Sequence, residues 1–228
     1  EPEPEPTDPE TFVIPDAGIG EGASCAATVD VDRPDRDALG ILTVVDEPTV
    51  LFSSSFDTSD LSAFQILSGS WVAADGDMAQ ITTCDFDATA LLRGFSVDHF
   101  RWEATLRADA GQNHGGLLIN QSSPTTRSGA TLIDLAESGA VVRWGTYDDA
   151  GYYQFGGSVP LVQPVDGSLV VISVEVHGAA VRSEIDGSTV SEIEVSHVGG
   201  LVGLVATQSK VAFASVVLTA LPANGEVV

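Results

Sequence analysis

The segment from Ser168 to Leu218 alternates apolar and polar residues with a period of two, and glycine-containing turns interrupt it. In its first strand one set of positions is apolar and the interleaved set is polar: Val170, Ile172, Val174 and Val176 against Ser173, Glu175 and His177. Successive side chains of a strand point to opposite faces, so the pattern is typical of a half-buried antiparallel strand. Turns are expected at His177-Gly178, Asp186-Gly187 and Gly199-Gly200. Asp-Gly suits a tight hairpin because both residues accept a positive φ, so the segment predicts an all-β fold.

The rest of the chain from Val50 onward repeats this pattern. We expect one hairpin from Trp71 to Thr82 around Asp75-Gly76, and a strand from Arg101 to Ala108 with Trp102 facing inward. Further strands are expected at 117–119, 131–135 and 141–145, and no segment has a helical stripe. Many short strands at regular spacing predict a two-sheet antiparallel sandwich or jelly roll, with Trp71 and Trp102 in its core.

The charge balance excludes some partners. The chain has 33 acidic and 9 basic residues, a formal net charge of −24, and Lys210 is its only lysine. Phosphate recognition needs clustered lysine and arginine, so nucleic acid is excluded as a partner, and an anionic membrane surface is disfavoured for the same reason. No apolar run approaches the roughly 20 residues of a membrane-spanning helix. The acidity indicates either solubility in an extracellular or salty setting or a cation-binding surface.

Four stretches are expected along the chain. Residues 1–24 begin EPEPEPTDPE, an extended acidic Pro-rich tail that either spaces a domain from a surface or has no role. Residues 25–48, with candidate strands at 28–32 and 41–45, are expected to pack on a sandwich formed by residues 49–222, and residues 223–228 form a C-terminal tail. Such a chain fits an exported protein, extracellular or at the cell surface, with a lipid anchor upstream as one option.

The two cysteines, Cys25 and Cys84, suggest one disulfide that would staple the N-terminal segment to the sandwich. Closing a loop of this length stabilises a fold by about 4 kcal/mol in the chain-entropy model. The alternative is two free, buried thiols. The acidic stretch from Asp30 does not fit an EF-hand, because Asp35 stands where that loop needs glycine and Ile41 where it needs glutamate.

Four stretches together resemble the concanavalin A-like jelly-roll superfamily, and specifically the laminin-G-like domains of bacterial secreted proteins. They are LFSSSFDTSDLSAFQILSGSWVAADGDMAQIT, WEATLRADAGQNHGGLLINQ, LVVISVEVHGAAVRSEIDGSTV and GGLVGLVATQSKVAFASVVL. The resemblance runs from about Val50 to Leu221 and depends on the order and spacing of the motifs. It implies lectins, carbohydrate-binding modules, adhesion domains or glycoside hydrolases, and a fold does not choose among these.

The glycosidases of this superfamily carry Glu-x-Asp-x-Glu, or a one-residue variant, along one strand. Glu184-Ile185-Asp186 begins in this way, but Gly187 and Ser188 follow it. We therefore expect Glu184 on the polar face of a hairpin, Asp186 in its turn, and no enzyme activity. Relatives often hold a structural Ca²⁺ near the first Phe-Asp, which makes Asp57 and Asp60 candidate ligands. Ala214 stands where many relatives carry aspartate on the last strand, and the alternative is that both aspartates cap a turn.

The segment from Arg143 to Tyr153 is the strongest candidate for sugar binding, because aromatic rings stack on sugars while planar polar groups bond their hydroxyls. It contains all three tyrosines of the chain, and its Gly and Asp residues favour a loop. The expected stacking residues are Trp144, Tyr147, Tyr152 and Tyr153, and the expected hydrogen-bonding residues are Arg143, Asp148 and Asp149, with Asn113, His114, Asn120, Gln121 and Asp134 as neighbours across the sheet. The alternative places Trp144 and one tyrosine in the core.

Three functions follow from these features. The first is a non-catalytic carbohydrate-binding or adhesion module that binds a glycan or a surface protein. The second is a structural or protein-interaction component of a cell surface or filament. The third is a glycoside hydrolase with an atypical site, which requires two facing carboxylates.

Overall fold

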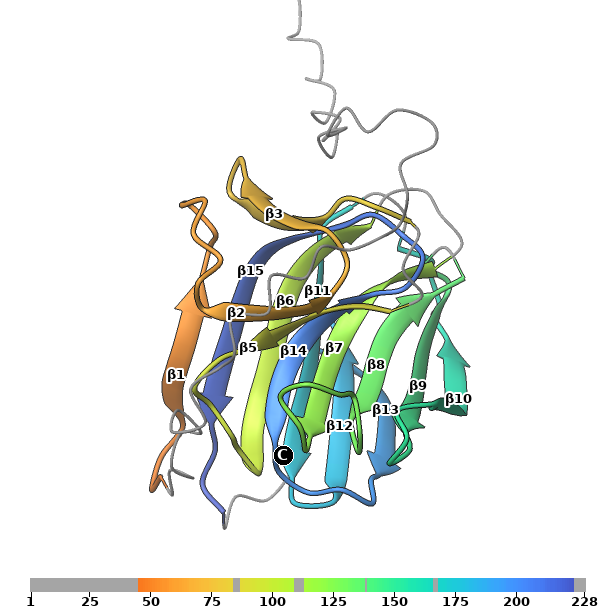
Figure 1. Cartoon of the computed structure of the whole chain (residues 1–228). Helices are drawn as coiled ribbons and strands as arrows, with labels where there is room; N and C mark the ends of the chain where they lie inside the picture. The colour runs from red at the N-terminus through yellow and green to blue at the C-terminus, as the bar shows by residue number, and fades with distance from the viewer. Residues whose placement is uncertain (1–44, 84–86, 109–112, 138, 166–167, 224–228) are drawn as a thin grey trace, which may run out of the picture.

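Two antiparallel β-sheets pack face to face in the computed structural model of this chain (Figure 1). The structure describes residues 45–223 except 84–86, 109–112, 138 and 166–167, and it also leaves the side chains of residues 108, 113 and 114 undescribed. All elements assigned in the described residues are strands, β1 to β15. The prediction of an all-β, two-sheet sandwich is therefore confirmed.

Sheet A contains eight strands. Their order is β13-β12-β11-β6-β15-β4-β3, and β1 pairs with the second half of β15 beyond β4. The bounds are β1 Thr49–Ser54, β3 Trp71–Ala74, β4 Asp77–Gln80, β6 His99–Ala108, β11 Val170–His177, β12 Ala180–Ile185, β13 Ser188–Glu194 and β15 Val211–Ala220.

Sheet B contains seven strands in the order β10-β9-β8-β7-β14-β5-β2. The bounds are β2 Phe64–Ser68, β5 Ala88–Leu92, β7 Asn113–Gln121, β8 Thr131–Ala136, β9 Val141–Tyr147, β10 Tyr153–Pro160 and β14 Leu201–Ala206. Strand β10 is one edge of this sheet, and among the described residues β9 is its only partner strand.

The predicted Asp-Gly turns form as expected. Asp186 and Gly187 have φ values of 48° and 74°, and Asp75 and Gly76 have 55° and 81°. Positive φ at both central residues matches the right-handed twist of the flanking strands, which is why these dipeptides join β12 to β13 and β3 to β4.

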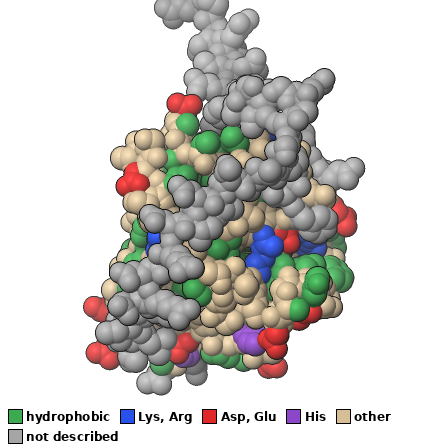
Figure 2. All heavy atoms as spheres, viewed as in Figure 1, with side chains coloured by type: hydrophobic (Ala, Val, Ile, Leu, Met, Phe, Trp, Pro, Cys, Tyr) green, Lys and Arg blue, Asp and Glu red, His purple; other side chains and the backbone are tan. Residues whose placement is uncertain are grey.

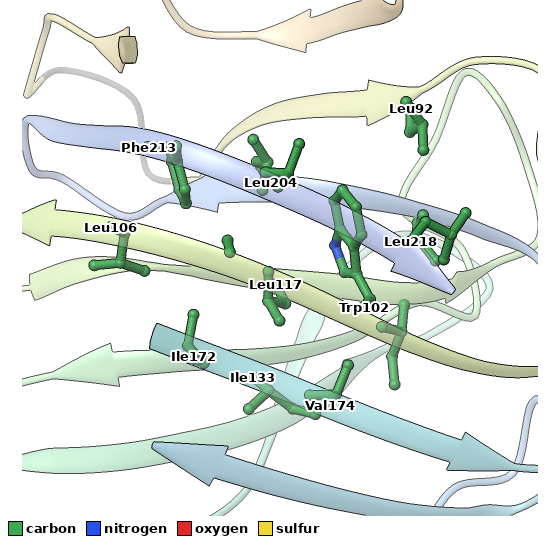
Figure 3. Packing of buried hydrophobic residues seen from close by; sticks show 14 of the residues in the cluster. Leu92, Trp102, Leu106, Leu117, Ile133, Ile172, Val174, Leu204, Phe213 and Leu218 are labelled. Carbon is green, nitrogen blue, oxygen red and sulfur yellow. The ribbon is translucent and has the colours of Figure 1, made fainter. Parts of the chain in front are cut away.

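The core lies between the two sheets. Trp102 is fully buried at its centre, and apolar residues from both sheets surround it (Figure 3). Its indole Nε1 donates to the carbonyl oxygen of Gly203 at 2.9 Å, a hydrogen bond from β6 of sheet A to β14 of sheet B. Trp71 is partly buried against the same core and packs 6.1 Å from the ring of Phe213. The expectation that these two tryptophans support the core is confirmed.

Several expectations fall outside the described residues. These include the acidic tail, the candidate strand at 28–32 and both members of the expected disulfide, Cys25 and Cys84. Of the candidate strand at 41–45 only Val45 is described, and it is not in a strand. Within the described residues the chain has no helix of the length and apolar character needed to cross a membrane.

Candidate functional site

The outer face of sheet B carries an unusual mixture of aromatic and charged side chains. Along β9, Val142 and Trp144 face the core between the sheets, so the alternation of the strand turns Arg143, Gly145 and Tyr147 outward. Figure 2 shows basic side chains beside an acidic one on this face, with hydrophobic side chains gathered toward β10. The segment expected as a loop is therefore mostly two strands, joined by residues 148–152.

Asp134 and Arg143 form the central ion pair of this face. They are opposite each other in the register of β8 and β9. The guanidinium donates to both carboxylate oxygens, from Nε to Oδ1 at 3.0 Å and from a terminal nitrogen to Oδ2 at 2.5 Å. On the other side Asp134 faces Gly116 of β7, where an added Cβ would lie 2.6 Å from the Cβ of Asp134. The absence of a side chain at Gly116 therefore gives the aspartate its space.

Burial controls the protonation of this pair. Asp134 has no exposed surface, and burial raises its pKa to about 6, while the hydrogen bonds and positive charge of Arg143 oppose that rise. The side chain of Arg143 is 21% exposed. Its pKa is raised because the attraction of Asp134 outweighs the cost of burial. At neutral pH the pair is therefore ionised, but the aspartate is held close to its titration range.

Two arginines and two tyrosines stack in series next to this pair. The guanidinium of Arg127 lies 5.7 Å from the ring centre of Tyr147, the rings of Tyr147 and Tyr153 are 5.4 Å apart in an edge-on arrangement, and the guanidinium of Arg143 lies 5.8 Å from the ring of Tyr153. These distances are typical of cation–π and T-shaped aromatic contacts. We call Arg127, Tyr147, Tyr153 and Arg143 the Arg–Tyr cluster.

A second buried carboxylate, Asp87, anchors this cluster. Its Oδ2 accepts from the hydroxyl of Tyr147 at 2.6 Å, and its Oδ1 accepts from the hydroxyl of Thr207 at 2.8 Å. Burial and the nearby carboxylate of Asp87 raise the pKa of Tyr147 well above its usual value. Burial likewise raises the pKa of Tyr153 to about 12, and Asp134 adds to the rise. Both tyrosines are therefore neutral hydrogen-bonding groups at physiological pH.

Arg127 connects the loop that follows β7 to β5 and β2, the strands at the opposite edge of sheet B from β10. Its guanidinium donates to the hydroxyls of Thr89 at 2.9 Å and Ser68 at 2.8 Å, and to the carbonyl oxygen of Asp87. The side chain of Gln65 donates to the carbonyl of Pro124 in the same loop at 3.0 Å. This loop therefore lies against β2 and β5.

Exposed aromatic rings flank the Arg–Tyr cluster on the β10 side. Tyr152, in the loop before β10, is 70% exposed, and Phe155 in β10 is 63% exposed. Phe155 lies two residues after Tyr153 and therefore points to the same face. It pairs with Gly145, over which the ring of Tyr153 lies, because an added Cβ there would be 2.5 Å from the tyrosine Cζ. The exposed ring of Phe155 thus shares the outward face of β9 and β10 with the arginine–aspartate pair.

The structure corrects the roles expected for several residues of the segment. Tyr147 is only 2% exposed, so its ring is not available as an open stacking platform. Trp144 faces inward and packs over Gly156 and Gly157, in agreement with the core alternative. Asp148 organises the loop, since its Oδ1 accepts from the backbone amides of residues 150 and 152 at 3.0 and 2.9 Å.

The other predicted ligand residues have separate surroundings. Asp149 is exposed in the loop. Asn120 is fully buried, and its amide donates to the carbonyl oxygen of His197 at 3.0 Å, which places it at the end of the sandwich. Gln121 is also fully buried and donates to the carbonyl of Ser123. The side chains of residues 113 and 114 lie outside the described residues. The structure thus brings Arg143, Asp134 and Tyr153 together and separates Asn120 from them.

The proposed calcium ligands form local turns. Asp60 accepts hydrogen bonds from the amide of Ser62 at 2.7 Å and from its hydroxyl at 2.9 Å, and these bonds lower the pKa of Asp60. Asp57 accepts from the hydroxyl of Ser55. In the described part of the chain no three His, Cys, Asp or Glu side chains come together in a metal-binding arrangement. The hydrogen bonds of Asp57 and Asp60 fit the alternative of turn capping.

The carboxylates that resembled a glycosidase signature lie elsewhere. Glu184 is on sheet A and pairs with Arg101 at 2.9 Å. Asp186 forms the turn, and its Oδ1 accepts from the amide of Val171 at 2.9 Å. On sheet B both oxygens of Asp134 are bound by Arg143, and both of Asp87 by hydroxyls. Acid catalysis and nucleophilic attack on a glycosidic bond each need a carboxyl oxygen that reaches the substrate, and these four oxygens are already engaged.

Sequence reasoning missed Asp87, Arg127 and Phe155. Asp87 and Arg127 lie 60 and 20 residues before Tyr147, and no local pattern links them to it. Phe155 carried a usable signal, because it follows Tyr153 by two residues and so shares its face in any strand.

Comparisons with known proteins agree on the architecture. The sequence matches no protein-family model, and no curated protein matches it. Among solved structures, carbohydrate-binding module CBM66 from Bacillus subtilis has a TM-score of 0.58 and 16% identity, over 66% of this chain and 91% of that one. The Bacillus licheniformis β-glucanase has a TM-score of 0.56 and 11% identity, over 75% of this chain and 97% of that one. A Bacillus subtilis protein of unknown function with a galectin-like fold has a TM-score of 0.60 and 9% identity, over 76% of this chain and 97% of that one.

These likenesses, at 16% identity or less, establish the fold. The chain has a concanavalin A-like jelly-roll sandwich, as its motifs predicted. The similar structures include both a carbohydrate-binding module and glycoside hydrolases, so the architecture by itself is compatible with sugar binding with or without catalysis.

Proposed function

We propose that this chain is a non-catalytic carbohydrate-binding or adhesion module, and that its ligand lies along β9 and β10 on the outer face of sheet B. One observation carries the proposal: the mostly exposed ring of Phe155 lies on the same outward face as the Arg143–Asp134 pair, because Phe155 pairs with Gly145, two residues after Arg143 in β9. Sugar recognition combines an aromatic surface for the C–H face with planar polar groups for the hydroxyls. This edge of sheet B supplies both.

Each residue has a distinct role in this proposal. Phe155 and Tyr152 supply stacking surface, since both rings are mostly exposed. The exposed part of the Arg143 guanidinium donates to sugar hydroxyls, while Asp134 fixes its orientation through two hydrogen bonds. Tyr153 supports both by packing under the guanidinium. A site held in this way is rigid before the ligand arrives, which lowers the entropic cost of binding.

The absence of catalysis is part of the proposal and is supported by the engagement of Asp87 and Asp134 in internal hydrogen bonds. We also place the module outside the cell, in keeping with its net charge of −24. Such a module would hold its polysaccharide, or a glycosylated surface, without cleaving it.

Screening against a broad glycan array tests the proposal. The double variant Tyr152→Ala/Phe155→Ala should bind the glycans that the wild type recognises at least tenfold more weakly, because each stacking contact contributes about 1 kcal/mol. Val50→Ala is the matched control, since Val50 is 59% exposed on β1 of the other sheet. Unchanged binding by the double variant, or no binding of any glycan by the folded wild type, contradicts the proposal.

The rival function, a structural or protein-interaction component, is favoured by one specific observation. Strand β10 is an edge strand, and its sequence YQFGGSVP has no charged residue. Edge strands of soluble proteins usually carry charges that prevent pairing with another chain. Light scattering over a range of protein concentrations separates the two functions: a dimer that Phe155→Lys dissociates supports the rival, and a monomer supports the glycan module.

A further inference from the structure

A long neutral stretch of the described chain borders the proposed ligand face. No charged residue occurs from Ala150 to Val165, in a chain with 33 acidic residues. This stretch contains β10 and three of the most exposed large apolar side chains, Tyr152 at 70%, Phe155 at 63% and Val162 at 101%. Strand β10 and the loop residues from Ala150 onward are therefore uncharged, and the nearest charge in the sequence is the exposed carboxylate of Asp149, which would repel an anion.

The charged residues on the face itself balance one another. Arg143 is paired with Asp134 through two hydrogen bonds. The other guanidinium of the Arg–Tyr cluster, that of Arg127, is used by two hydroxyls and a carbonyl oxygen. Asp87 supplies the second negative charge. The two positive and two negative groups cancel, and each already has its partners within the protein.

Anionic glycans need a different surface. Carboxylate and sulfate groups are recognised by guanidinium or ammonium groups that are free to form charge-assisted bonds, often bidentate ones. Here Arg143 already makes its bidentate bond with Asp134. A net charge of −24 also repels an approaching polyanion over about 10 Å at moderate ionic strength.

We infer that the ligand is an uncharged polysaccharide chain, held by ring stacking and hydroxyl hydrogen bonds, and that uronate-rich or sulfated glycans are rejected. This inference rests on the proposed function, since it names the chemical class of ligand for the same face. It predicts an affinity that depends little on salt, because no counterions are released when a neutral ligand binds.

Affinity electrophoresis with matched polymers tests the inference. The full chain is run through native gels that contain dextran, mixed-linkage β-glucan or galactomannan, and through gels with the sulfated form of each polymer. We expect at least one neutral polymer to retard the protein, its sulfated form to bind at least tenfold more weakly, and the neutral affinity to stay within about twofold between roughly 0.05 and 0.5 M NaCl. Phe155→Ala should weaken the retardation about fivefold, the loss expected from one stacking contact of about 1 kcal/mol, and Val50→Ala should preserve it.

The outcomes separate the two proposals. Preferential binding of sulfated polymers that weakens as salt rises overturns the inference and leaves the carbohydrate-binding function standing. Binding of neutral polymers that Phe155→Ala leaves intact places the ligand on another face and overturns both the site and the inference. If the folded protein binds none of the polymers, and no glycan on the array, the proposed function fails and the inference fails with it.

Discussion

The two outer faces of the sandwich hold their charged groups in opposite ways. On sheet A, Glu175 contacts Arg101 at 3.7 Å, Arg182 at 3.3 Å and His177 at 3.2 Å. Glu184 contacts the same two arginines at 2.9 and 3.2 Å. Each of these carboxylates therefore has more than one cationic partner, and the network is redundant.

On sheet B the carboxylate of the ion pair is buried more deeply and has fewer cationic partners. The Asp134 side chain has no exposed surface, against 9% for Glu184 and 33% for Glu103 on sheet A. Its ion pair is with Arg143 alone among the bridges formed by the described residues. Next to this pair the ring of Tyr153 lies against the Arg143 guanidinium, and the ring of Tyr147 packs edge-on against Tyr153. The comparison indicates that sheet A tolerates the loss of one charge, while sheet B depends on each member of its site.

The largest effect is expected from removing the cation of the sheet B pair. Arg143→Met leaves the carboxylate of Asp134 buried without its partner, which should lower the free energy of unfolding by about 3–5 kcal/mol in urea titrations. Arg101→Met is the matched change on sheet A and should cost about 1 kcal/mol, because Arg182 still contacts Glu175 and Glu184. Equal costs for the two variants would remove the distinction between the faces.

A double variant checks that the cost arises from the unpaired charge. Asp134→Leu combined with Arg143→Met replaces both members by apolar side chains, and buried pairs replaced in this way usually lose little stability. We expect the double variant to recover most of the stability that Arg143→Met loses. If it remains as unstable as the single variant, the lost packing of the Arg143 side chain is responsible, not the charge of Asp134.

The second prediction concerns pH. Because burial raises the pKa of Asp134 to about 6, the folded state binds more protons than the unfolded state between about pH 4 and pH 6. The contribution of this residue to stability is therefore largest at low pH and is lost as the pH rises through 6, with a slope of up to about 1.4 kcal/mol per pH unit. In the Asp134→Asn variant the free energy of unfolding should no longer fall in this way between pH 4 and pH 6. Parallel stability profiles of wild type and variant from pH 4 to 7 would show that Asp134 does not titrate in this range.

The fold was predictable because its signals are local. Alternation along residues 101–107 placed Trp102 in the core, and the positive φ that Asp186-Gly187 accepts fixed the following hairpin. Sheet pairing between distant strands, such as β14 with β5 and β7, has no comparable local signal. The order of the strands within each sheet was therefore not predicted and is known only from the structure.

The site was predictable only in part. The segment from Arg143 to Tyr153 was correctly singled out as the place where aromatic and polar groups gather, and the register of β8 with β9 joins two of its candidates, Asp134 and Arg143. The sequence did not show that Tyr147 is covered, because the groups that cover it, Arg127 and Asp87, come from distant loops. Exposure is a property of the folded surface, so it separated Phe155 from Tyr147 only in the structure.

The third prediction distinguishes the two tyrosine hydroxyls of the Arg–Tyr cluster. The hydroxyl of Tyr147 donates to Asp87, so Tyr147→Phe should cost about 2 kcal/mol, the usual worth of a hydrogen bond to a charged group. The hydroxyl of Tyr153 is buried without a hydrogen-bond partner among the described residues. Tyr153→Phe should therefore leave the free energy of unfolding within about 0.5 kcal/mol of wild type, or raise it. A larger loss of stability in Tyr153→Phe than in Tyr147→Phe would contradict the assigned hydrogen bonds.

The smallest effect is expected at the exposed margin of sheet A. Glu103 contacts Arg101 at 3.3 Å, and both side chains are about one-third exposed, at 33% and 30%. Glu103→Gln should change the free energy of unfolding by less than about 1 kcal/mol, because an exposed ion pair gains little over water and Arg101 keeps Glu184 as a partner. Glycan binding should be unaffected, since Glu103 lies on the sheet opposite the proposed ligand face. A loss of binding in this stable variant would move the ligand to sheet A, and the charge network there would then be its binding surface.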